Sequence, residues 1–207
     1  ISDLILNLTI SNEQNMTIIS QLENDLERAR ALSDPNHNVC YFALADNKGF
    51  PSIRTLVLRS VSAGGITLFT NKTSPKWKIL EDNPHCQILL WYPSIQIQYR
   101  LSGICSDLGQ TNLEQDWQRR PNKSKLLDHF YDTIQAQSQP IASRQKLTDG
   151  LKQLSTQIPP EGFFMPPSAG AFNVDIKEVE TLQLSQSEEP HIRELHTKSD
   201  AGWATQT

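Results

Sequence analysis

The feature that most constrains the fold is a run of short, alternating apolar segments that are separated by turn residues and lie within residues 38–108. The turn at residues 46–49 ends in Gly49, which suits a left-handed conformation, and Gly64 and Gly65 supply the next turn. Strands at this spacing are typical of an antiparallel barrel rather than a sandwich. The expected strands are residues 39–45, 50–60, 66–70, 86–92 and 95–108.

The length of 207 residues suits a single domain, with helical segments on both sides of the strand region. We expect an N-terminal helix within 1–35, a barrel core at 38–108, a helical insertion at 111–157 and closing strands at 170–207. Residues 11–14 have the form of a capping box, and Ile19, Leu22, Leu26 and Ala29 follow at helical spacing. The charged stretch 23–30 is expected to be the solvated side of that helix.

Composition excludes some classes of function. A net charge of −4 and a pI near 5.7 provide no basic surface for nucleic acid. The chain has no apolar run of transmembrane length and no signal-peptide pattern, so we expect no membrane association. Three widely spaced cysteines in apolar segments suggest buried thiols in the cytoplasm, with no metal site.

A possible anion site lies at Ser74-Pro75-Lys76. Serine is a good N-cap and proline suits the first helical position, so a helix should begin here and end before residues 83–84. The free N–H groups of the first turn and the Lys76 ammonium could bind an anion. An ordinary capped surface helix with a solvated lysine is the alternative.

Two neighbouring strands carry polar residues in unusual places. Arg54 and Arg59 flank an apolar run, and a guanidinium at a buried strand end needs an anionic partner, which could be a ligand or a protein carboxylate. In residues 95–101 the apolar and polar side chains alternate, which places Gln98 on the polar face. Gln98 could bond a heterocycle edge, or this face could simply be solvated.

The order of these features, from the arginines through Phe69-Thr70-Asn71 and Ser74-x-Lys76 to the strand with Gln98, resembles the pyridoxamine 5'-phosphate oxidase family. The resemblance is closest to its Alr-type FMN-binding split-barrel branch. It implies a mainly β fold with α additions, a six-stranded antiparallel split β-barrel with flanking helices. It also implies FMN as cofactor and a homodimer with the FMN sites at the interface.

The resemblance also assigns residues to the cofactor. It implies that the FMN phosphate is held by Arg54, Ser74 and Lys76. Other contacts on the same subunit would be Thr55, Leu56, Val57, Phe69, Thr70 and Gln98. Gln137, Ser138 and Arg193 would reach FMN from the second subunit.

In the family reaction, a hydride passes from pyridoxamine or pyridoxine 5'-phosphate, or a related small molecule, to the flavin. The resemblance implies that the substrate contacts Arg59, Arg120, Ser124 and His191. His191 is also the candidate catalytic residue, although a lone histidine in a strand is more often structural.

Four residues depart from the family pattern: Pro75 and Glu189 replace arginines, Asp116 replaces a tyrosine and Leu182 replaces a tryptophan. A carboxylate at Asp116 would repel a phosphate. Three hypotheses therefore stay open: an FMN-dependent oxidoreductase, a flavoprotein without vitamin oxidase activity, or a split-barrel module that binds another ligand.

Overall fold

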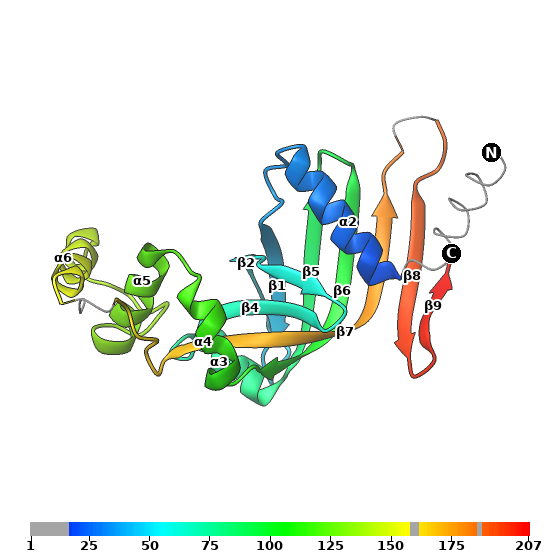
Figure 1. Cartoon of the computed structure of the whole chain (residues 1–207). Coiled ribbons are helices and arrows are strands. Elements are labelled where there is room, and N and C mark those ends of the chain that lie inside the picture. Colours follow the sequence, from blue (N-terminus) through cyan, green and yellow to red (C-terminus); the bar gives the residue numbers. More distant parts are fainter. Residues whose placement is uncertain (1–16, 158–161, 186–187) are drawn as a thin grey trace.

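The computed structural model describes residues 17–157, 162–185 and 188–207. Its centre is a curled antiparallel sheet with the order β2-β1-β5-β6-β7-β4-β3, and β8 and β9 continue from β7 (Figure 1). The strands are β1 Val39–Ala45, β2 Pro51–Val57, β3 Ser60–Ser62, β4 Gly65–Asn71, β5 His85–Tyr92, β6 Ile97–Asp107, β7 Ala169–Gln183, β8 Ile192–Ser199 and β9 Gly202–Gln206. The helices are α2 Ile18–Ala31, α3 Pro75–Asp82, α4 Gln110–Gln118, α5 Asn122–Thr133 and α6 Arg144–Ser155.

The expected class, a mainly β split barrel with flanking helices, is confirmed, but the described chain has nine strands rather than six. One reason is that residues 50–60 do not form one strand. β2 stays paired with β1 as far as Val57, and the chain then turns at the buried Leu58 so that β3 pairs with β4. This corner leaves Arg59 between two strands.

The long strand β7 joins the two parts of the sheet. Its first half pairs with β4, its second half pairs with β8, and β6 pairs with it from Phe172 to Gln183. The turn before β4 depends on Gly65, whose φ is +117° and whose added Cβ would lie 2.3 Å from the Val174 carbonyl oxygen. The predicted turn at Gly49 is also present, with φ +83°.

Alternation along β6 places Ile97, Tyr99 and Leu101 in the core and leaves Gln98 on the outward face, as predicted. The core holds the inward side chains of β1, β4, β5, β6 and β7 together with one face of α2. Leu182 is only half-buried because it lies on the outward face beside Gln98.

Helix α2 lies across the sheet (Figure 1) and buries Ile19, Leu22, Leu26 and Ala29, as the sequence predicts. Its N-cap is Thr17; the predicted capping box at residues 11–14 lies outside the described residues. The expectation that residues 23–30 are solvated is wrong at Asp25, which is 5% exposed. Asp25 is buried because the hydroxyl of Tyr99 donates to its carboxylate at 2.6 Å.

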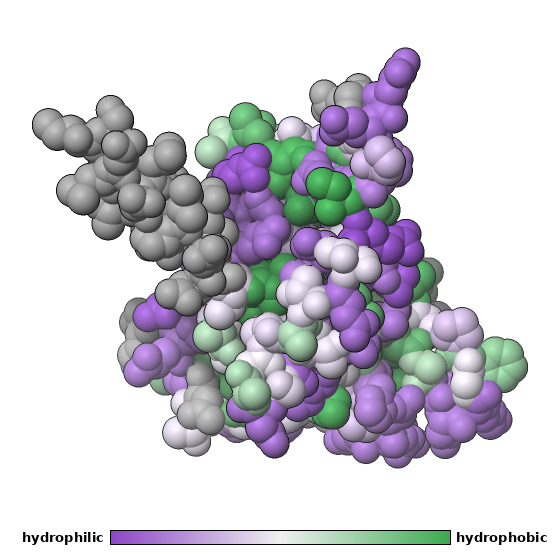
Figure 2. Space-filling model, turned by 90° about the vertical axis from the view of Figure 1, so that its right-hand side faces the viewer, coloured by the Kyte–Doolittle hydropathy of each residue, from purple (hydrophilic) through white to green (hydrophobic). Residues whose placement is uncertain are grey.

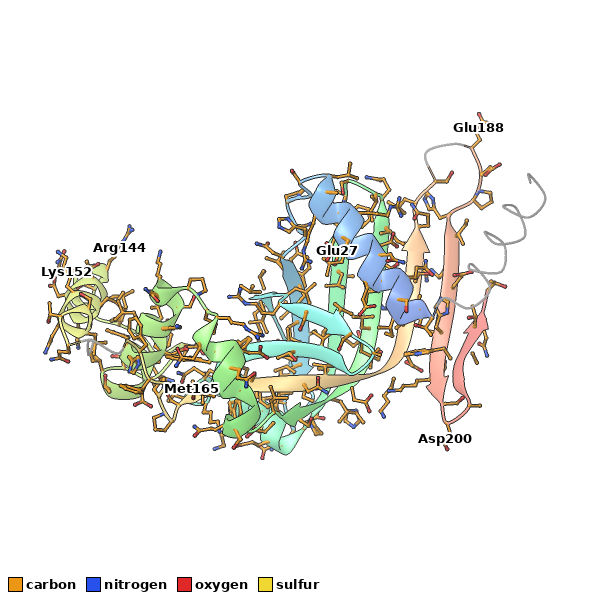
Figure 3. The ribbon with its side chains drawn as sticks, in the orientation of Figure 1. Glu27, Arg144, Lys152, Met165, Glu188 and Asp200 are labelled. Carbon is orange, nitrogen blue, oxygen red and sulfur yellow. The ribbon has the colours of Figure 1, made fainter. Side chains whose placement is uncertain are left out.

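Helices α5 and α6 form an arm that extends from the sheet on the side away from β8 and β9 (Figure 1). Arg144 and Lys152 of α6 lie at one end of the molecule, and Glu188, in the loop between β7 and β8, lies at the other (Figure 3). The loops beside β8 are therefore remote from the helical arm within one chain.

The three cysteines are free and buried, as predicted. In the part of the chain that the structure describes, no group of His, Cys, Asp or Glu side chains could hold a metal ion. No helix of that part is long and apolar enough to cross a membrane.

Candidate functional site

The first candidate site is at the start of α3. The helix begins at Pro75 with Ser74 as N-cap, as predicted, but the Ser74 hydroxyl makes no capping hydrogen bond. It lies 3.4 Å from the Thr70 hydroxyl at the end of β4, and Ser74 is 2% exposed. The hydroxyl groups of Thr70 and Ser74 thus lie next to the N-terminal N–H groups of α3.

Arg54 points inward from β2, opposite Phe42 of β1. Its Nη2 donates to the Ser52 hydroxyl at 2.8 Å, whereas its Nη1 is buried and has no hydrogen-bond partner. No carboxylate of the described residues forms an ion pair with Arg54, and burial lowers its pKa. A buried guanidinium nitrogen without a partner is costly, so this atom points to an anionic ligand.

Lys76 lies close enough to Arg54 for the two charges to repel. Burial, with the Arg54 charge as the second cause, lowers the pKa of Lys76 to about 8. The Lys76 ammonium donates to Gln137 Oε1 at 3.1 Å, and the Gln137 N–H donates to the Thr73 hydroxyl at 2.9 Å. The resemblance placed Gln137 on a second subunit; here it contacts Lys76 of its own chain.

A second group lines a cavity of about 250 Å³ between β3, β4 and α4. It brings together two residues expected to bind substrate, Arg59 and Arg120, and one expected to contact flavin, Phe69. The Arg120 guanidinium lies over the Phe69 ring, 5.1 Å from its centroid. The full lining is Arg59, Ser60, Thr67, Phe69, Asp116, Arg119 and Arg120.

Carboxylates neutralise two of the three arginines in this cavity. The Arg119 guanidinium donates to the Asp116 carboxylate at 3.0 Å and forms an ion pair with it. Arg120 pairs with Asp128 of α5, which also accepts from the Trp117 indole at 2.8 Å. Burial raises the pKa of Asp128, and Arg120 opposes that shift. Arg59 is exposed and has no ion-pair partner among the described residues.

A third group lies on the outward face of the sheet. Gln98 of β6 is the register partner of Leu182 of β7, which in turn is the partner of Arg193 of β8. Arg193 lies 3.7 Å from Glu180, which also pairs with Arg100 at 3.2 Å. Gln98 and Arg193 therefore share one surface, and it is opposite the face that carries Arg54.

The other predicted residues are more scattered. Thr55 and Val57 point outward from β2, whereas Leu56 points inward beside Arg54. Ser138 is exposed in the turn after Gln137, with φ +64°, and Ser124 lies in the first turn of α5 outside the cavity. His191 is exposed, and its Nδ1 accepts from the Ser185 N–H at 2.9 Å.

Sequence reasoning missed Asp128 and Thr73. Asp128 forms an ion pair with Arg120 and accepts a hydrogen bond from the Trp117 indole, and the Thr73 hydroxyl accepts one from the Gln137 N–H. A carboxylate eight residues after Arg120 on the next helix was the available signal for Asp128. Nothing in the sequence distinguishes Thr73 from an ordinary loop threonine.

The profile of the pyridoxamine 5'-phosphate oxidase family matches residues 27–157, which is more than half of the chain. This chain belongs to the pyridoxamine 5'-phosphate oxidase family. The pyridoxine/pyridoxamine 5'-phosphate oxidase of Deinococcus deserti is 32% identical over 78% of this chain and 74% of its own length. The enzyme of the same name from Anaeromyxobacter dehalogenans is 26% identical over 89% of this chain and 91% of its own length.

Two solved structures confirm the fold of this family member. PhzG from Burkholderia lata, in complex with tetrahydrophenazine-1-carboxylic acid, has a TM-score of 0.83 at 20% identity and covers 94% of this chain and 93% of its own. A pyridoxamine 5'-phosphate oxidase-related, FMN-binding protein from Nostoc punctiforme has a TM-score of 0.71 at 20% identity, covering 90% and 94%.

Proposed function

We propose that this chain is an FMN-dependent oxidoreductase of the pyridoxamine 5'-phosphate oxidase type, with the FMN phosphate bound between Arg54 and Lys76. The observation that carries the proposal is the buried Arg54 Nη1, which has no partner, next to an ammonium whose pKa is lowered. Two half-buried cations that repel each other and have no carboxylate between them are stabilised when an anion neutralises them. The Ser74 hydroxyl and the N-terminus of α3 add uncharged donors to the same point.

Bound FMN would supply the acceptor for a hydride from a substrate carbon. The cavity with Arg59 and Arg120 is also lined by Phe69, which the resemblance assigns to the flavin, so we place the substrate there. A small-molecule substrate with an anionic end fits the positive lining of this cavity.

The hydrogen bond of His191 favours a role as hydrogen-bond donor to the substrate over a role as general base. Its Nδ1 accepts from a backbone N–H, so the proton of the neutral ring is on Nε2. The side chain can then donate a hydrogen bond through Nε2 but offers no lone pair there.

A second candidate function is a flavoprotein without vitamin oxidase activity. The observation that favours it is Asp116, whose carboxylate lies in the cavity that would receive a substrate phosphate. In this case the protein binds FMN and does not turn over pyridoxamine or pyridoxine 5'-phosphate. A steady-state assay of the flavin-loaded protein with both vitamin phosphates separates the two candidates.

The phosphate site is tested by Arg54→Ala and Lys76→Ala. Each variant removes a charge-assisted contact, so each should weaken FMN binding by about 1.5–3 kcal/mol in a fluorescence titration. Lys78→Ala is the matched control, because Lys78 is exposed on the same helix and should leave the flavin Kd unchanged. An unchanged Kd in both test variants would reject the site.

A further inference from the structure

We infer that the cavity between β3, β4 and α4 selects a substrate that carries a carboxylate rather than a phosphate ester. This inference rests on the proposed function, because it specifies the substrate class of that site. It starts from the charges of the cavity, three arginines and one aspartate in its lining, with Asp128 directly behind Arg120.

The arginines are not equally available to a ligand. Asp128 holds Arg120, and these two side chains are only 6% and 13% exposed, so their pairing is fixed within the protein. Asp116 holds Arg119 at the cavity rim, where both side chains are more exposed. Arg59 is the guanidinium of the lining that has no carboxylate partner among the described residues. The five side chains together carry one net positive charge.

A single guanidinium without a carboxylate partner can neutralise a ligand that carries one negative charge. The attraction between a ligand and a fixed charge grows in proportion to the ligand charge, whereas the cost of removing the ligand from water grows with its square. A phosphate monoester is close to a dianion above pH 7, so it needs about two compensating cations. A carboxylate needs one, and its two oxygens match the fork of a single guanidinium.

The uncharged part of the lining agrees with this assignment. The Ser60 and Thr67 side chains supply hydroxyl groups, and the Phe69 ring supplies an apolar wall. The Asp116 carboxylate, where the family resemblance has a tyrosine, donates to neither kind of anion, and it repels a dianionic phosphate more than a monoanionic carboxylate. A cavity of about 250 Å³ is below the usual size for a whole ligand, so it would hold the anionic end of a larger molecule.

The test compares benzoate with phenyl phosphate at pH 8, two probes that share a ring and differ in the anionic group. Binding is followed by NMR through the backbone amide shifts of Ser60 and Thr67, which report this cavity and not the Arg54–Lys76 site. We expect the benzoate Kd to be lower by about threefold to fivefold, the size of one exposed charge interaction. Tighter binding of phenyl phosphate would overturn the inference.

Asp116→Asn provides the decisive variant, because it frees Arg119 and adds one positive charge to the cavity. It should shift the ratio of the two Kd values toward phenyl phosphate by about threefold to fivefold. Glu114→Gln is the matched control, since Glu114 is an exposed carboxylate on α4 that does not line the cavity. An unchanged ratio in Asp116→Asn would also overturn the inference.

A flavin titration of the same samples keeps the two proposals apart. Normal FMN binding with a preference for phenyl phosphate would reject only the carboxylate assignment. A preference for benzoate in a protein that does not bind FMN would reject only the proposed cofactor.

Discussion

At the scale of single residues, Lys76 has the clearest physical signature of function. A lysine usually keeps its ammonium in water, but this one is held beside Arg54 with Gln137 as its hydrogen-bond partner. Its folded pKa of about 8 lies below the ordinary value of 10.5, so the protonated form is disfavoured in the folded protein. The charged Lys76 therefore destabilises the flavin-free protein, and a bound anion at this site would remove that destabilisation.

This cost predicts how stability depends on pH. The destabilisation by Lys76 is fully present below about pH 8 and is relieved as the pH rises toward 10.5, because the unfolded chain then binds more protons than the folded chain. Lys76→Met should raise the unfolding free energy of the flavin-free protein at pH 7 by about 1–3 kcal/mol. Denaturant unfolding should show that the gain shrinks between pH 8 and 10.5.

The matched control is Lys78→Met on the same helix, which should change the unfolding free energy by less than about 0.5 kcal/mol at every pH. A gain from Lys76→Met that is the same at pH 7 and pH 10.5 would contradict the titration of Lys76.

At the scale of elements, the packing of α2 on the sheet depends on one buried polar contact as well as on its apolar stripe. Asp25 is buried, accepts from the Tyr99 hydroxyl at 2.6 Å and pairs with Arg28 at 2.6 Å. Burial, and then Asp25, raises the pKa of Tyr99, which therefore stays a donor. This contact fixes which residues of α2 face β6.

Tyr99→Phe should destabilise the protein by about 1–3 kcal/mol, because it leaves one carboxylate oxygen of Asp25 buried without this donor. Thermal unfolding monitored by circular dichroism measures the effect. Tyr41→Phe removes the hydroxyl of a half-buried tyrosine on the outward face of β1 and should have little effect. Equal losses from both substitutions would show that the Tyr99–Asp25 contact contributes nothing specific.

At the scale of the whole molecule, the predicted flavin contacts fall on two faces of one sheet. Arg54, Lys76 and Gln137 lie on the inner side, and Gln98, Leu182 and Arg193 form a row on the outward side. The outward face also exposes Ile53, Val57 and Leu195, at 68%, 49% and 36%. From the β8–β9 end, hydrophobic surface is visible among hydrophilic side chains (Figure 2). We therefore propose a homodimer in which Arg193 reaches the partner's phosphate site. Gln98, which the resemblance assigned to the same subunit as Arg54, lies on the face of Arg193 and would reach the flavin from the partner as well.

Mixing two variants tests this arrangement. Lys76→Ala and Arg193→Ala each damage one half of the proposed site, and a heterodimer of the two has one site with both wild-type residues. Statistical reassembly should restore tight FMN binding to about a quarter of all sites. If both residues act within one chain, fluorescence titration of the mixture will show no recovery.

The alternation in residues 95–101, the turns at Gly49 and Gly65 and the Ser74-Pro75 helix start were readable from the sequence, because each depends on neighbours in the chain. The position of Asp25 was not, because its burial depends on a tyrosine 74 residues away. Asp116 is a different case, because Arg119, which pairs with it, lies only three residues further along the chain. The sequence therefore contained this pairing, although we inferred from it only that Asp116 would repel an anion.

The sequence by itself determined most of the strand positions, the helix start at Ser74-Pro75 and the residue types that resemble the family. Only the tertiary structure decided how those residues are grouped: Gln137 bonds Lys76 in one chain, Gln98 and Arg193 flank Leu182 on the opposite face, and Arg59 and Arg120 line one cavity. The physical reason is that local backbone preferences act over a few residues, whereas charge neutralisation and burial depend on distances that only the folded sheet sets.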